Sequence, residues 1–107
     1  MPKPGSRQQV YTLVVEVGRS DGDDLPAKAT GGGLMLFSTG VDEAEAVREA
    51  VNVLKQAGLA PLDVTGYGTL AEREAEGHEI GQDERNLMDR ALAENAVIIA
   101  QMTPYYD

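Results

Sequence analysis

Three segments of the chain carry apolar side chains on both of their alternating faces, and this feature constrains the fold most strongly. They are residues 9–18 (QVYTLVVEVG), 34–39 (LMLFST) and 96–102 (AVIIAQM). Segments so rich in β-branched, aliphatic and aromatic residues favour strands, whose successive side chains point to opposite faces of a sheet. A sheet built from these segments therefore needs apolar cover on both faces.

Two helices are predicted to supply part of that cover. The first spans residues 42–57, because Asp42 is a suitable N-cap and Glu45 completes an acidic variant of the capping box. The second begins at a capping Asp83 and ends near Asn95. Both carry apolar residues at helical spacing, which are Val47, Ala50, Val51 and Leu54 in the first and Leu87, Met88, Ala91 and Leu92 in the second.

The remaining segments complete the predicted order β-β-α-β-α-β. A further strand opens at Pro61, and the polar residues 71–81 are predicted as a loop with one helical turn. This order predicts a two-layer α+β sandwich, ferredoxin-like in style, with a mixed sheet of about four strands and both helices on one face. Of the 107 residues, 42% are hydrophobic and none is cysteine, so the core must form without disulfides. We predict a flexible tail at residues 1–8 and a single domain at residues 9–107.

That arrangement leaves apolar residues uncovered on the second face of the sheet. The set includes Val10 and Val14, with either Met35 and Phe37 or Leu34 and Leu36. Leaving a patch of this kind in water costs about 25 cal/mol per Å². We therefore expect a homodimer that packs through the open sheet face. The alternative is that a long loop, residues 19–32 or 70–82, folds across that face.

The chain is acidic, with nine basic and eighteen acidic residues and a net charge of −9. A surface of that sign repels phosphate backbones and anionic lipid, so we expect neither a nucleic-acid nor a membrane partner. No apolar run approaches the ~18 residues of a membrane span, and the first residues lack the apolar region of a signal peptide, which predicts a cytoplasmic location. The acidity serves either solubility or steering toward a basic protein partner.

Motifs that could carry chemistry have simpler structural explanations. Residues 66–71 fit G-x-G-x-x-A, but the following glutamates would repel a pyrophosphate, so a glycine-relaxed strand end is favoured. The triple glycine at 31–33 lacks a following Lys-Ser/Thr and is predicted as a bulge or flexible entry into a strand. His78 is the sole histidine, whereas a catalytic zinc site needs two or three histidines or cysteines, so an exposed loop histidine is favoured. We therefore expect no enzymatic activity, no metal and no cofactor.

The segment YTLVVE at 11–16, followed by a turn, a strand and the helix opening DEAEA at 42–46, resembles HicB-type antitoxin domains. The resemblance covers less than half of the chain. The family's Pro-Asp-Leu-Pro-Gly-Cys-like stretch is missing, and residues 31–37 stand in its place. Membership of that family is therefore not inferred.

The sequence as a whole favours a non-enzymatic protein-interaction or regulatory module, immunity-like or antitoxin-like. The predicted partner-binding residues are the acids of the two helices and the terminal aromatic pair, namely Glu43, Glu45, Glu49, Asp83, Glu84, Asp89, Tyr105 and Tyr106. One alternative is a small-ligand-binding domain that uses a cleft near residues 31–33 and 66–68. A less favoured alternative is a small metal-dependent enzyme that uses His78.

Overall fold

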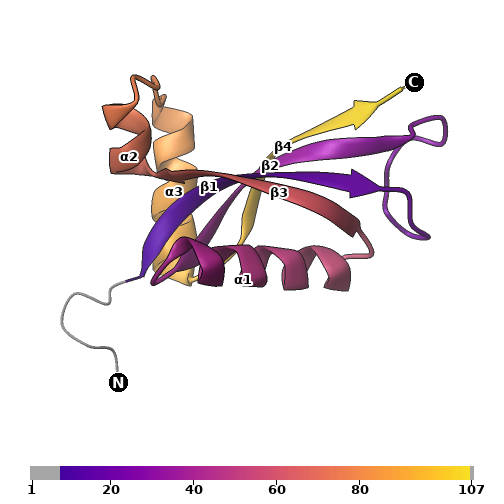
Figure 1. Cartoon of the computed structure of the whole chain (residues 1–107), viewed down its shortest axis with the longest axis horizontal. Coiled ribbons are helices and arrows are strands. Elements are labelled where there is room, and N and C mark those ends of the chain that lie inside the picture. The colour runs from indigo at the N-terminus through magenta and orange to yellow at the C-terminus, as the bar shows by residue number, and fades with distance from the viewer. Residues whose placement is uncertain (1–7, 107) are drawn as a thin grey trace.

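The computed structural model describes residues 8–106 as a small α+β domain, with a four-stranded antiparallel sheet and three helices (Figure 1). The elements in chain order are β1 (Gln9–Gly18), β2 (Gly31–Gly40), α1 (Glu43–Gln56), β3 (Ala60–Thr69), α2 (Leu70–Ala75), α3 (Gln82–Glu94) and β4 (Ile98–Tyr105). The predicted tail lies outside the described residues except for Gln8. No helix in residues 8–106 combines the length and the hydropathy needed to cross a membrane.

All neighbouring strands pair antiparallel, in the order β3-β1-β2-β4. The prediction of a mixed sheet is therefore wrong. Because β1 lies between β2 and β3 and is antiparallel to both, those two strands run in the same direction without touching. The connection through α1 thus passes over β1, and β4 joins the free edge of β2 in the opposite direction.

The helices cover opposite faces of the sheet, so the prediction of both helices on one face is also wrong. α1 packs its buried Ala50 and Leu54 against the face that carries Leu13 and Leu36. α3 packs against the other face, in a second cluster centred on Phe37. Leu36 and Phe37 are adjacent in β2 and both fully buried, so each face needs its own apolar cover at this point.

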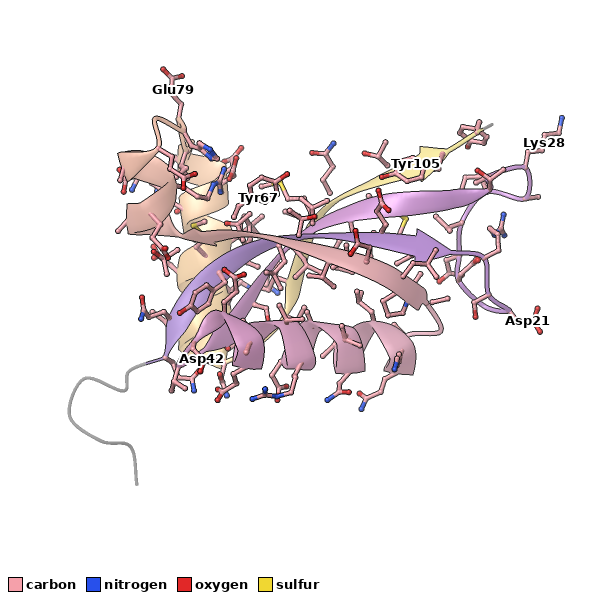
Figure 2. All side chains as sticks on the ribbon, viewed as in Figure 1. Asp21, Lys28, Asp42, Tyr67, Glu79 and Tyr105 are labelled. Atoms are coloured by element: carbon pink, nitrogen blue, oxygen red, sulfur yellow. The ribbon has the colours of Figure 1, made fainter. Side chains whose placement is uncertain are left out.

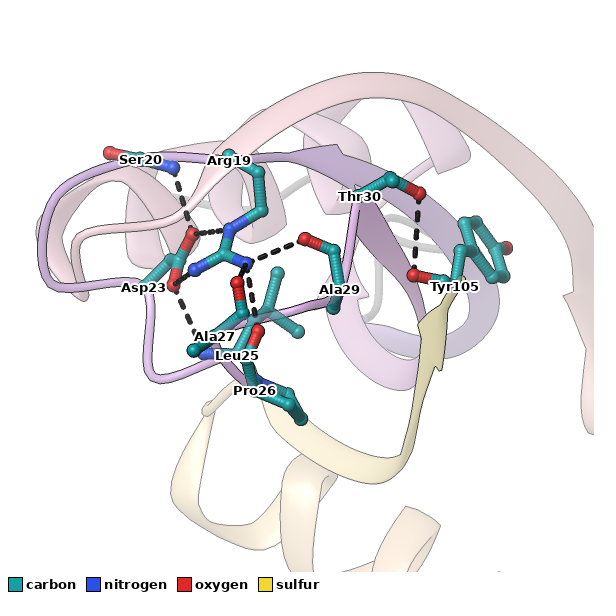
Figure 3. Close-up of polar contacts among 9 residues, drawn as sticks. All are labelled: Arg19, Ser20, Asp23, Leu25, Pro26, Ala27, Ala29, Thr30 and Tyr105. Carbon is teal, nitrogen blue, oxygen red and sulfur yellow. Dashed lines mark hydrogen bonds and ion pairs between the residues drawn. The ribbon is translucent and has the colours of Figure 1, made fainter. Parts of the chain in front are cut away.

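The long connection between β1 and β2 folds onto the α1 side of the sheet rather than across the second face. Its Leu25 and Ala29 are buried in the same cluster as α1. Arg19 holds the connection together (Figure 3): its Nη1 donates to the carbonyl of Ala29 at 2.6 Å, and its Nε donates to Asp23 Oδ2 at 2.9 Å. Backbone N–H groups of Ser20 and Leu25, together with Arg19, hold the pKa of Asp23 below its usual value.

Several predicted boundaries shift in the structure. The first helix is confirmed, with the backbone N–H of Glu45 donating to Asp42 Oδ1 at 2.8 Å. Asp83 is not the cap of α3, because the N-cap is Gly81, which has no side chain to accept a bond. The triple glycine belongs to β2 itself and is not a bulge or flexible entry. A side chain at Gly31 would put its Cβ 2.6 Å from the carbonyl oxygen of Val17, so the strand needs glycine there.

The last two strands also differ from prediction. β3 has two register shifts against β1, so its side chains do not alternate regularly between the two faces, and Leu62 is 72% exposed. Leu70 begins α2 instead of continuing the strand. β4 runs from Ile98 to Tyr105 rather than over 96–102, because Val97 turns into the cluster beneath α1.

Candidate functional site: an open face of the sheet

α3 covers only part of its face of the sheet, and the remainder is exposed. Val10 and Met35 both pack against the cluster under α3, whereas Val14, four residues along β1 from Val10, lies outside it. Val14 and Met35 line surface hollows beyond the helix. We call this remainder the open face; it consists of Val14, Glu16, Gly33, Met35, Asp63, Thr65, Tyr67, Gln101, Thr103 and Tyr105. Figure 2 shows Tyr67 and Tyr105 on the side of the sheet away from α1.

Two hollows meet on the open face and form one groove. The first, of about 180 Å³, is bounded by Tyr67, Arg73 and His78. The second, of about 270 Å³, is bounded by Gly33, Gln101, Thr103 and Tyr105. Both share a floor of Val14 and Met35. Each hollow offers a recess for a single side chain of a partner, and the two together are as large as a small-molecule pocket of ~300–1,000 Å³.

The side chain of Arg73 forms the wall of the first hollow. α2 begins directly after β3 with a capping box in which Thr69 and Glu72 bond to each other's backbone N–H groups. That start places Arg73 so that its Nη1 donates to Thr12 Oγ1 at 3.1 Å and to Glu84 Oε2 at 3.0 Å. The side chain is only 9% exposed. Arg73 therefore ties β1, α2 and α3 together at one end of the groove.

His78 lies on a loop as predicted, but it is bonded to the same arginine and is partly buried rather than fully exposed. Arg73 Nε donates to His78 Nδ1 at 3.2 Å, which places the proton of the neutral ring on Nε2. Nε2 lies 3.8 Å from a carboxylate oxygen of Glu76, and the ring centroid lies 6.4 Å from that of Tyr67. Within residues 8–106, no three histidine, aspartate or glutamate side chains are grouped to hold a metal ion.

Two carboxylates lie next to each other on the open face. Glu16 of β1 and Asp63 of β3 are direct cross-strand partners, and both are exposed. Neither belongs to an ion pair in the part of the chain that the structure describes. Like charges directly opposite each other in a sheet are destabilising. The open face thus combines an apolar groove with an uncompensated negative pair.

The structure separates the acids that the sequence grouped together. Glu43, Glu45 and Glu49 lie on α1, whereas Asp83, Glu84 and Asp89 lie on α3, across the sheet. Glu84 is occupied by its ion pair with Arg73, and Glu45 Oε1 accepts a bond of 3.2 Å from Gln8. Of the predicted residues, Tyr105 lies on the open face, and Tyr106 follows it with its side chain exposed.

The predicted helix acids line other parts of the surface. Glu45 and Glu49 line a hollow of about 360 Å³ beside Asn95, and Asp89 lines one of about 340 Å³ beside Val10. None of the predicted helix acids lines the groove of the open face.

The pKa of Tyr11 is raised above its usual value. Burial is the main cause, and the nearby carboxylates of Glu72, Asp42 and Glu43 add to it.

Sequence reasoning missed most of the groove. Val14 and Met35 stood among the apolar residues without cover, and alternation was the signal that identified them. The predicted ligand cleft near residues 31–33 and 66–68 has a counterpart, since Gly33 borders one hollow and Tyr67 the other. Arg73 gave no signal, because it lies in a polar stretch and its partner Thr12 is 61 residues away.

Comparison with known proteins places the chain in a family. No curated protein and no solved structure matches the sequence. A protein-family model, the domain of unknown function DUF8846, matches residues 10–106. That match covers nearly the whole of the sheet and the three helices described above. The chain therefore belongs to the DUF8846 family.

Proposed function

We propose that the chain is a non-enzymatic protein-interaction module, regulatory, immunity-like or antitoxin-like, whose contact surface is the open face. The observation that carries the proposal is the groove, with Val14 and Met35 as an apolar floor and a tyrosine at each end. Apolar surface with a polar rim marks interaction sites, and tyrosine is enriched in protein interfaces. Each of the two hollows can accept one anchor side chain of a partner.

Two carboxylates on the open face, outside the groove itself, favour a basic partner. Glu16 and Asp63 repel each other across the strands, and a lysine or arginine from a partner placed between them relieves that repulsion. The net charge of −9 adds long-range attraction for the same kind of partner. We accordingly expect neither nucleic acid nor membrane lipid to bind. We also propose that the module is cytoplasmic.

The proposal predicts salt-dependent binding that charge reversal on the open face abolishes. The full chain, used as bait at low ionic strength, should capture a basic protein whose association rate falls at least about tenfold at high salt. The double variant Glu16→Lys with Asp63→Lys should abolish capture. The matched control is Glu49→Lys with Asp89→Lys, which makes the same change in net charge on the two helices. This control should keep most of the capture. Binding that is unchanged by salt and by the open-face substitutions would show that the acidity serves solubility alone.

A small-ligand-binding domain is the second candidate, and the groove itself is what favours it. A thermal-shift screen with metal ions and nucleotides separates the two functions, because a ligand that binds only the folded chain raises its melting temperature. The interaction module predicts no shift with any of these compounds. A reproducible shift that Val14→Lys removes would favour the small-ligand function instead.

A further inference from the structure

The two edge strands of the sheet differ in how they are protected against pairing with another strand. β3 carries Pro61, the charged Asp63 and two register shifts, all of which are devices that block edge-to-edge pairing. β4 (IIAQMTPY) carries no charged side chain, in a chain with a net charge of −9. It has one register shift, beside Ala100, and Pro104 lies near its end. The stretch between these two, residues 101–103, is the unprotected part of the edge.

Apolar side chains are exposed along the same edge. Ile99 is 42% exposed, Met102 39% and Tyr105 40%. A neighbour with many charges would leave these residues beside unpaired charge, whereas a second β4 brings uncharged and apolar side chains. We propose that a second copy of this chain pairs antiparallel with β4 and extends the sheet to eight strands across a two-fold axis. The sequence predicted a homodimer through the open face; the structure assigns the contact to the edge instead.

Edge pairing has a consequence for the groove. A two-fold axis perpendicular to the sheet keeps both open faces on the same side. The second hollow is bounded by Gln101, Thr103 and Tyr105 of β4, so it lies at the edge where the copies meet. The dimer therefore joins two grooves into one longer surface. The pairing does not depend on the proposed function, since it involves only two copies of this chain.

Two threonines provide a matched test of this interface. Thr103 of β4 and Thr65 of β3 are both exposed, both on the open face, and lie at opposite edges of the sheet. We expect wild-type protein to sediment as a dimer at high concentration. Thr103→Glu should sediment as a monomer, because two new carboxylates then lie diagonally across the two-fold axis on the same face of the joined sheet. Thr65→Glu makes the same chemical change and should remain dimeric. High salt should partly restore the Thr103→Glu dimer, provided that circular dichroism shows it folded.

Three results would overturn the proposal. A wild-type chain that stays monomeric over about a hundredfold range of concentration excludes a dimer of useful affinity. Equal dissociation of the Thr103→Glu and Thr65→Glu proteins places the contact on the open face rather than on the edge. A Thr103→Glu protein that stays dimeric places the contact elsewhere. If Thr103→Glu fails to fold, Gln101→Glu, a change of nearly equal size on the same strand, replaces it with the same expected outcome.

Discussion

Replacement of Phe37 by alanine is expected to lower the free energy of unfolding by about 3–5 kcal/mol. Phe37 is the bulkiest of the fully buried side chains, and it is the centre of the cluster that holds α3 against the sheet. Its removal deletes the apolar contacts of Met88 and Ala91 and leaves a cavity between helix and sheet. A loss of this size is a large part of the ~5–15 kcal/mol that stabilises an ordinary domain.

Urea unfolding measures the effect of Phe37→Ala. The control is Leu62→Ala, which should change stability by less than about 0.5 kcal/mol because that side chain is largely exposed. If Phe37→Ala does not fold, Phe37→Leu keeps most of the volume and should cost about 1 kcal/mol. A Phe37→Ala protein as stable as wild type would mean that α3 does not pack on this face.

Replacement of Arg73 by alanine is expected to cost about 2 kcal/mol. The side chain is nearly buried, and its loss leaves Glu84, Thr12 and His78 without their shared donor. The cost is below that of a fully buried pair because the Glu84 side chain is 33% exposed and regains water. Arg90→Ala breaks the exposed pair with Glu94 and should cost no more than about 0.5 kcal/mol.

Thermal and urea unfolding of the two arginine variants give the comparison directly. Equal small losses for Arg73→Ala and Arg90→Ala would contradict the structural role of Arg73. A loss confined to Arg73→Ala, together with a change in the His78 ring signals in the folded protein, would agree with it. The histidine signals matter because Arg73 Nε is the bonded neighbour of His78 Nδ1.

Local signals in the sequence were sufficient for the elements but not for their arrangement. The Asp42 cap and the apolar stripe predicted α1, because capping and helical periodicity act within a few residues. The cap of α3 was misplaced by two residues, at Asp83 instead of Gly81, because Gly81 caps the helix without a side chain. The face that each helix covers depends on how its connections cross the sheet, and no window of local sequence contains that information.

The open face was partly visible in the sequence and its groove was not. Alternation identified Val14 as an apolar residue without cover, but not that α3 would cover Val10 and stop short of Val14. The like-charge pair of Glu16 and Asp63 depends on the register of β1 against β3, which includes two shifts. The helix acids appeared to be one binding surface only because both helices were expected on the same face.

A sheet face that α3 covers only in part predicts different solvent accessibilities for the methyl groups of three methionines. Met88 lies beneath α3 and is 3% exposed, Met35 borders both hollows of the groove, and Met102 is exposed on β4. NMR of methyl-labelled protein with a soluble paramagnetic agent should broaden Met102 most, Met35 clearly and Met88 least. A Met35 signal as protected as that of Met88 would show that the face is covered and would contradict this account.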